Sequence, residues 1–314
     1  MMIAADAAAC QLVQLAQWPV RPSHYLPVVE GTINGKKAGI LLDTGAALSI
    51  IHSSEVRRLE LTPISLRGQR IFGIGGESRV AGVYIDELKI GDAARKDWLA
   101  IVTGDRPLGG GIALILGYDF FHQTEIEFDL PHNVVRLFLA KGCERASLAY
   151  WTKDAGEVAL ESSAVIELPV AIDGKPLQAQ LDSGASVSTL ARISATDLGA
   201  TEQSAGVVPG GCTVGIGGAA IDSWIAPFKS FAIGSELVRN PKLRFADLWK
   251  HMKTEETGSS IPRRIGRQPD MLLGADFLRA HRVFISHSQR KMYFSYVGGT
   301  VFSGTPGRPC PRSG

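Results

Sequence analysis

Apolar stretches of strand length recur along the chain, separated by glycine-rich breaks, and their order occurs twice. Each half opens with two strands joined by a two-residue turn, at Asn34–Gly35 in the first half and Asp173–Gly174 in the second. Such turns favour tight hairpins because both turn residues take positive φ. In each half the second strand ends at an aspartate, Asp43 or Asp182, eight residues after the turn glycine. The repeat predicts two related lobes.

A glycine-rich motif is the next feature of both halves. The sequence Gly-Ile-Gly-Gly occupies Gly73–Gly76, 30 residues after the first aspartate, and Gly215–Gly218, 33 residues after the second. β-Prone residues flank both copies, so each copy predicts the tip of a hairpin. A plain flexible turn is the simpler interpretation. A phosphate-binding loop fits less well, because neither copy leads into a helix with Lys-Ser/Thr.

An apolar strand that ends at glycine follows in both halves, as Leu114–Gly117 and Met271–Gly274. An aspartate two residues further on predicts a short helix with Asp119 or Asp276 as its cap. Each half closes with a pair of strands, Glu125–Phe128 with Val134–Phe138 and Val283–Ile285 with Met292–Phe294. Four features in the same order, twice, indicate an all-β protein of two lobes with short helices, related by a pseudo-twofold axis.

The repeats divide the chain into five parts. The first lobe spans residues 27–140, a linker spans 141–164, and the second lobe spans 165–296. Residues 1–26 form an N-terminal segment that can pack on a lobe. Residues 297–314 form a tail of Gly, Pro and Arg with little periodicity, which we expect to be loose.

The second repeat is the longer one. Most of its excess lies in Asn240–Asp270, which is rich in charge, glycine and proline. Within this stretch the pattern predicts a short helix over Phe245–Met252.

The composition is that of a globular protein and limits the classes of partner. The chain has 314 residues, with 33 Lys and Arg against 31 Asp and Glu, for a formal charge of +2. This balance predicts no strong attraction to nucleic acid or to an anionic membrane. No apolar run is long enough to span a bilayer.

The four cysteines leave two readings open. Cys10, Cys143, Cys212 and Cys310 form no CxxC pair, so a zinc site is not indicated. They are either isolated buried thiols or, in an oxidising compartment, two disulfides. The N-terminal small residues resemble those around a signal cleavage site, so we expect a periplasmic or secreted protein and keep a cytosolic one as an equal alternative. In an exported protein we expect a Cys10–Cys143 bond, because these residues flank the first lobe.

The repeated Asp-[Thr/Ser]-Gly-Ala sequence carries the candidate chemistry. A single copy suits any tight turn. Two copies at the ends of apolar strands in matching repeats suggest that Asp43 and Asp182 meet, because burying a lone acid is costly. Two adjoining carboxyls share a proton, so one acts as base and the other as acid. Such a pair can activate a water for attack on a peptide bond without a metal or cofactor.

The residues around the two aspartates suit that role. Gly45 and Gly184 allow two loops to approach face to face, and Thr44 and Ser183 offer hydroxyls that can brace the loops or simply cap the turns. The predicted flap and substrate-binding residues are Gly73, Ile74, Gly75, Gly76, Gly215, Ile216, Gly217, Gly218, Ala46 and Ala185. Glycine gives the tips the mobility that a lid requires.

Together these motifs resemble the retropepsin-type aspartic proteases in their bacterial two-repeat form, over residues 27–140 and 165–296. The resemblance implies two closed β-barrel lobes with one cleft, Asp43 and Asp182 as the catalytic pair, and a peptide or protein substrate. It implies that Gly117 and Gly274 lie at the crossing behind the catalytic loops.

The chain departs from the viral members of that family. Tyr118 and Ala275 replace the Arg that follows the late glycine, and Ala47 and Ser186 replace the acids that hold the substrate backbone. These differences bear on the substrate preference rather than on the acid pair.

Other functions are weighed against this one. The seven histidines form no His-Glu-x-x-His motif, and no Gly-x-Ser-x-Gly motif is present, which disfavours a metallohydrolase and a serine hydrolase. A non-catalytic peptide-binding protein on the same fold remains the rival, and a proenzyme covered by residues 1–26 is a third possibility. The linker predicts that one chain forms one complete site, against the alternative of a swapped dimer.

Overall fold

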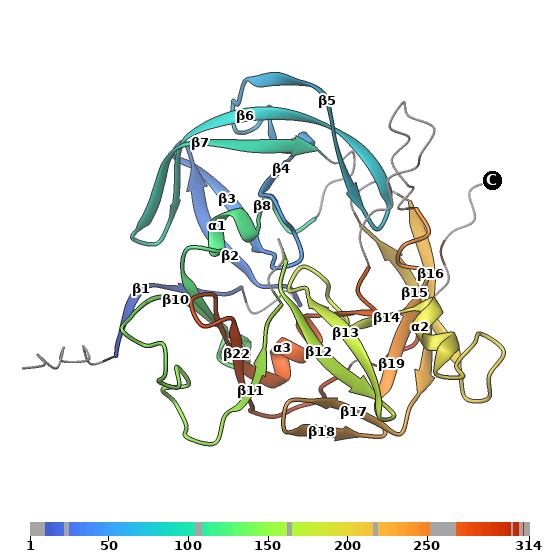
Figure 1. Cartoon of the computed structure of the whole chain (residues 1–314). Coiled ribbons are helices and arrows are strands. Elements are labelled where there is room, and N and C mark those ends of the chain that lie inside the picture. Colours follow the sequence, from blue (N-terminus) through green and yellow to red (C-terminus); the bar gives the residue numbers. More distant parts are fainter. Residues whose placement is uncertain are drawn as a thin grey trace, which may run out of the picture.

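Two lobes of β-strands make up the molecule in the computed structural model (Figure 1). The structure describes residues 10–21, 25–103, 109–161, 165–215, 219–251, 268–302, 304–307 and 310. The first lobe lies at the top of Figure 1, the second at the lower right, and a group of strands from both lobes at the lower left. The predicted tip residues 216–218 lie outside the described residues.

The first lobe is a seven-stranded sheet in the order β2-β3-β8-β4-β7-β6-β5. Its strands are β2 (Val28–Ile33), β3 (Lys36–Leu42), β4 (Ile50–His52), β5 (Pro63–Gly73), β6 (Gly76–Ile90), β7 (Ala93–Thr103) and β8 (Ile112–Leu116). The β2–β3 hairpin turns at Asn34 and Gly35, whose φ values of 48° and 76° are the positive ones that the sequence predicts. An additional pairing of β2 with β6 closes the strands into a barrel.

The second lobe repeats this order with one interruption. Its strands are β12 (Glu167–Ile172), β13 (Lys175–Leu181), β14 (Thr189–Ala191), β15 (Val208–Val214), β16 (Ala220–Pro227), β17 (Ser230–Ile233), β18 (Glu236–Arg239), β19 (Lys242–Ala246) and β20 (Met271–Leu273). β17 pairs with β12 as β6 pairs with β2. Pro227 ends β16 and Pro241 separates β18 from β19, because proline has no N–H to continue a ladder. Two pairs of short strands thus replace the long β6 and β7.

A six-stranded sheet joins the lobes. It contains β1 (Gln11–Pro19), β10 (Val134–Lys141), β9 (Glu125–Asp129), β21 (His281–Ser286), β22 (Lys291–Tyr296) and β11 (Gly156–Ala159), in that order. Both predicted strand pairs are present, and β9 of the first lobe pairs with β21 of the second. The N-terminal segment packs on the first lobe through β1, which pairs with β10.

Buried charges lie at this junction. Glu127 is fully buried and ion-pairs with Arg136 of its own lobe and with Arg282 of the second lobe, the latter at 3.2 Å. Arg282 also stacks on the rings of Tyr150 and Trp151 in the linker. A buried carboxylate needs cationic partners. Because Glu127 has one arginine partner in each lobe, these ion pairs help to hold the two lobes in their observed arrangement.

The helices are short: α1 (Tyr118–Phe121), α2 (Arg192–Asp197), α3 (Ala275–Ala280) and the 3₁₀ helices η1 (Ser53–Glu55) and η2 (Leu130–His132). The prediction that aspartates cap α1 and α3 is wrong, because Gly117 and Gly274 occupy the cap positions. The predicted helix that begins at Phe245 is also wrong over its described part. Phe245 lies in β19, fully buried in the barrel, and turns follow it.

Two disulfides tie down the ends of the described chain. Cys10 is bonded to Cys143, the expected pair, and Cys212 of β15 is bonded to Cys310 of the tail. Gly307 forms a bridge with Gly210 of the same strand. The described part of the tail is therefore attached to the second lobe, contrary to the expectation of a loose end.

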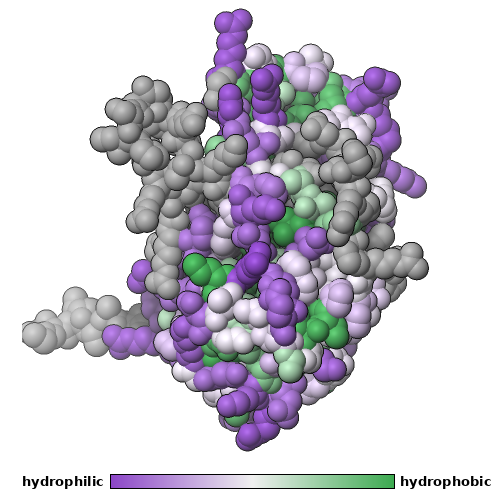
Figure 2. Space-filling view, turned by 90° about the vertical axis from the view of Figure 1, so that its right-hand side faces the viewer, coloured by the Kyte–Doolittle hydropathy of each residue, from purple (hydrophilic) through white to green (hydrophobic). Residues whose placement is uncertain are grey.

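On the face shown in Figure 2, polar residues predominate and apolar residues form small separate patches. Apolar side chains are instead concentrated in the barrel interiors and the joining sheet. Within the described part of the chain, no helix is long and apolar enough to cross a membrane.

Candidate active site

Two matching loops bring Asp43 and Asp182 to the centre of the molecule. Asp43 follows β3 and donates its N–H to Leu116 at the end of β8, and Asp182 follows β13 and donates its N–H to Leu273 at the end of β20, both at 2.9 Å. Each aspartate is thus fixed where two parallel strands end side by side.

Backbone donors orient each carboxyl within its own loop. The Oδ1 atom of Asp43 accepts from the N–H groups of Gly45 at 2.8 Å and Ala46 at 3.2 Å. The Oδ1 atom of Asp182 accepts from Gly184 and Ala185, both at 3.0 Å.

The two carboxyls contact each other across the lobe boundary. Each carboxyl perturbs the pKa of the other, as expected for two acids in close contact. A Cβ placed on Gly45 would lie 2.5 Å from the carboxyl carbon of Asp182, and a Cβ on Gly184 would overlap the carboxyl of Asp43. Only glycine at both positions allows this approach.

Thr44 and Ser183 brace the loops symmetrically. The Thr44 Oγ1 atom donates to Leu181 O at 2.7 Å and accepts from Ser183 N at 3.0 Å. The Ser183 Oγ atom donates to Leu42 O at 2.6 Å and accepts from Thr44 N at 2.9 Å. Both residues are almost fully buried, so each hydroxyl satisfies backbone groups of the other lobe.

A second brace lies behind each loop, at the serines six residues past the aspartates, which the sequence suggested as braces of the following strand. Ser49 Oγ donates to Asp119 at 2.6 Å and accepts from Gly117 N at 2.9 Å. Ser188 Oγ makes the same contacts with Asp276 and Gly274, at 2.6 and 2.9 Å. The spacing of six residues from aspartate to serine hinted at a role for the serines, but nothing local showed that the helix aspartates are their partners.

The glycines at 117 and 274 lie against the backs of the catalytic loops. A Cβ on Gly117 would lie 2.7 Å from Ala46 O, and one on Gly274 would lie 2.8 Å from Ala185 O. The carbonyl oxygens of Ala46 and Ala185 accept hydrogen bonds from the N–H groups of Tyr118 and Ala275, the residues directly after the two glycines. Ala46 and Ala185 therefore hold the loops through their backbones, and their contact with substrate stays a prediction.

Burial raises the pKa of both acids above the ordinary value of 3.8. For Asp43, the N–H donors of its loop partly offset this effect. For Asp182, the negative charge of Asp43 adds to burial and raises the pKa well above that value. Because the two acids act on each other, they titrate as a pair that shares a proton.

The first predicted hairpin tip is present and touches the second. β5 and β6 are connected through Ile74 and Gly75, and Gly76 has a φ of 104° that favours glycine. Ala219 donates its N–H to Gly75 O at 3.2 Å, and Ile74 packs against apolar residues of the second lobe. A Cβ on Gly215 would lie 3.1 Å from the Cβ of Ile74. The two hairpins therefore meet, although 216–218 of the second lie outside the described residues.

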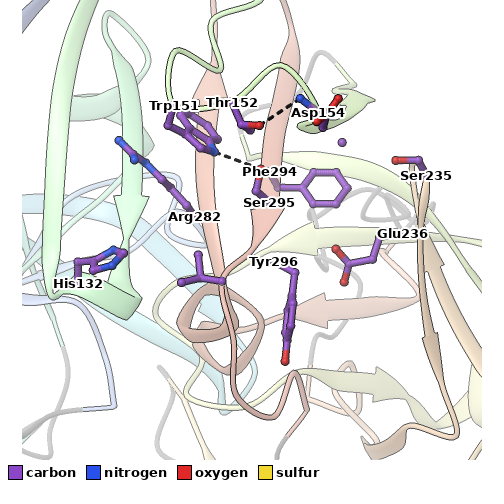
Figure 3. A pocket seen from close by; sticks show the side chains of 12 residues that line it. His132, Trp151, Thr152, Asp154, Ser235, Glu236, Arg282, Phe294, Ser295 and Tyr296 are labelled. Carbon is purple, nitrogen blue, oxygen red and sulfur yellow. Dashed lines mark hydrogen bonds between the residues drawn. The ribbon is translucent and has the colours of Figure 1, made fainter.

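A separate cavity of about 560 Å³ lies beside the joining sheet (Figure 3). It is lined by His132, Trp151, Thr152, Asp154, Gly156, Ser235, Glu236, Arg282, Phe294, Ser295, Tyr296 and Val297. Neither aspartate of the pair lines it, so it belongs to the linker region and not to the paired acids. Among the described residues, no group of three or more His, Cys, Asp or Glu side chains is placed to hold a metal.

Comparison with known proteins agrees with this geometry. A family model described as aspartyl protease matches the chain twice, at residues 29–120 and 168–277. The search of curated proteins found no match. Among solved structures, the aspartic proteinase from Irpex lacteus superposes with a TM-score of 0.55 over 94% of this chain and 99% of that chain. Its sequence identity is 10%, so that likeness shows the fold alone. The expected family and the all-β, two-lobe fold are thus confirmed: the chain belongs to the aspartyl protease family, with one match in each of its two repeats.

Proposed function

We propose that the protein is an aspartic endopeptidase that uses Asp43 and Asp182 to hydrolyse peptide bonds in protein or peptide substrates. The observation that carries the proposal is the close approach of the two acids, each seated against the glycine of the opposite loop and raised in pKa by burial. Because a pair in contact gives up its two protons in separate steps, one proton stays on the pair over a range of acidic pH.

The singly protonated pair can carry out both halves of the hydrolysis. The ionised carboxylate takes a proton from a water, whose oxygen forms a bond to the peptide carbonyl carbon. The protonated carboxyl gives its proton to the carbonyl oxygen, leaving a tetrahedral diol. The carboxyl that took the water proton then gives it to the nitrogen, and the C–N bond breaks. The other carboxylate takes a proton from a diol hydroxyl as the carbonyl is restored, so the pair again holds one proton.

The hairpin tips at Ile74 and Gly215 would close over the substrate. Their mutual contact requires an opening movement before an extended peptide can enter.

Asp43→Asn and Asp182→Asn test this function. Each variant should lose peptide cleavage by several orders of magnitude and remain folded. Asp86→Asn is the matched control, because Asp86 is an exposed aspartate of β6 in the first lobe and should leave cleavage unchanged. Retention of cleavage in either pair variant would refute the proposal. A non-catalytic peptide-binding protein would bind peptides equally well in all four forms and cleave none of them.

One chain is proposed to supply one complete site and to act as a monomer. The pairing of β9 with β21 and the ion pair of Glu127 with Arg282 support this, because both join the lobes of a single chain. A mixture of Asp43→Asn and Asp182→Asn chains should stay inactive under exchange conditions. Recovered activity would indicate a swapped dimer instead.

The proposed location is the periplasm or the extracellular space. All four cysteines are paired in the structure, and disulfides persist in oxidising compartments. Peptide mapping of the native protein without reductant should recover Cys10 linked to Cys143 and Cys212 linked to Cys310. Free thiols in the native protein would favour the cytosol.

A further inference from the structure

One row of side chains across the sheet of each lobe differs in chemistry between the lobes. In the first lobe the strand register places Val28 beside Leu41, Leu41 beside Ile115, Ile115 beside Ile50, and Ile50 beside Ile101. Paired residues share a face of the sheet, so these five side chains form a continuous row.

The second lobe contains the equivalent row at the same register. It runs Glu167, Gln180, Leu272, Thr189 and Arg244. Four of the five apolar positions of the first row therefore carry an acid, an amide, a hydroxyl and a base in the second. Only the Ile115 position keeps an apolar residue, Leu272.

Both rows lie outside the barrel interiors. The strand neighbours Ile40, Leu42 and Ile51 belong to the main core, whereas four residues of the first row belong to a separate cluster: Val28, Leu41, Ile50 and Ile115. Ile71 of the first hairpin packs against this cluster, and Ile74 at its tip packs with Leu272 of the second row. The rows therefore face the hairpins that cover the paired acids.

The rows also pass close to those acids in the sequence. Leu41 and Gln180 each precede the aspartate of their loop by two residues. The Gln180 side chain crosses to the other lobe and donates its Nε2 to Gly45 O at 3.1 Å. A substrate side chain next to the scissile bond would thus meet one row or the other, according to the lobe that it faces.

Arg244 gives the second row its charge. Its guanidinium donates to Gly210 O and, at 2.8 Å, to Ser223 Oγ, both of them neutral groups. Among the described residues, no carboxylate lies within ion-pair distance of Arg244, and Asp276 acts on it only from further away. Desolvation lowers the pKa of this half-buried arginine, which a bound anion would offset.

We infer that the cleft selects side chains of opposite kinds: an apolar one against the first-lobe row, and an acidic one on the second-lobe side that reaches Arg244. An extended peptide presents successive side chains to opposite sides, so it can offer one to each lobe. The inference rests on the proposed protease function and deepens it by naming the substrate class.

A peptide-library digest tests the inference. Wild-type sites should show an apolar residue on one side of the cleaved bond and Glu at one fixed position on the other. In Arg244→Met, the ratio of kcat/KM for a Glu peptide to that for its Leu counterpart should fall about tenfold or more, the usual size of a lost hydrogen bond to a charged group. Arg239→Met is the control, because Arg239 is an exposed arginine of β18 in the same lobe and should leave the ratio unchanged.

A second measurement needs no variant. The wild-type preference for Glu over Gln should disappear below a pH of about 4, where the substrate carboxyl becomes neutral. Equal apolar preference on both sides, an unchanged ratio in Arg244→Met, or a Glu preference that persists when the carboxyl is neutral would each overturn the inference while leaving the protease intact. A wild type that cleaves no peptide would overturn the proposed function itself.

Discussion

Removal of the Ser183 hydroxyl tests the brace between the lobes most directly. The hydroxyl donates to Leu42 O at 2.6 Å and accepts from Thr44 N at 2.9 Å, and the residue is fully buried. Ser183→Ala therefore leaves one carbonyl and one N–H of the first lobe without partners in a buried site. Each unsatisfied group costs about 1–3 kcal/mol, so the free energy of unfolding should fall by about 2–6 kcal/mol.

Thr44→Val should cost a similar amount, because it removes the reciprocal bonds to Leu181 O and Ser183 N with little change in volume. Thr44→Ser keeps the hydroxyl and is the matched control, with a loss of about 1 kcal/mol for one buried methyl group. Since the two hydroxyls serve one junction, the Thr44→Val/Ser183→Ala double variant should lose less than the sum of the single losses.

Urea unfolding, followed by both fluorescence and circular dichroism, measures these changes through the midpoint at constant slope. Activity provides a second readout, because a displaced loop separates the two acids. A loss below about 0.5 kcal/mol in Ser183→Ala would refute the reasoning, as would strict additivity of the two losses. In either case the hydroxyls would not act as a shared brace.

The remaining predictions concern charge. Because the pKa of Asp182 is raised in the fold, wild-type stability should fall as pH rises from about 3.8 towards the folded-state pKa. The stability gain of Asp182→Asn over wild type should therefore grow across this window. A constant difference in melting temperature between the two proteins from pH 3 to 7 would contradict this. Peptide cleavage should be greatest at acidic pH and decline as the shared proton leaves the pair, and a rate that keeps rising through pH 8 would exclude the pair as the acid and base. Glu127→Ala should destabilise the protein by about 3–5 kcal/mol in urea, because Arg136 and Arg282 lose their fully buried partner. Glu157→Ala removes an exposed ion pair and should cost less than about 1 kcal/mol. Equal losses in the two variants would contradict a stabilising role of the Glu127 ion pairs between the lobes.

The sequence by itself determined the architecture, because the relevant signals are local. The turns at Asn34–Gly35 and Asp173–Gly174 need positive φ, which few residue types adopt readily. The repeated order of turns and apolar strands predicted the two lobes. Asp43 and Asp182 lie at the same distance from the turn glycine in each repeat, which predicted that they meet as a pair. Local glycine requirements also made the close approach of the two loops predictable.

Tertiary structure decided the features that depend on contacts between distant segments. The side chains of Asp119 and Asp276 do not cap their helices but serve as acceptors for Ser49 and Ser188, some 70 and 88 residues away. Phe245 joins a strand because the barrel buries it, which overrides any local preference for helix.

The contrast between the two cleft rows also became visible only in the fold. Leu41 and Gln180 occupy equal positions in the repeats, yet nothing near either residue shows that both belong to matching rows across the two sheets. Strand register, which arises from pairing across the whole sheet, places Arg244 in line with Gln180 although 64 residues separate them in the chain. A pattern with a period of two residues tells which face a side chain takes, but only the assembled sheet tells what that face meets.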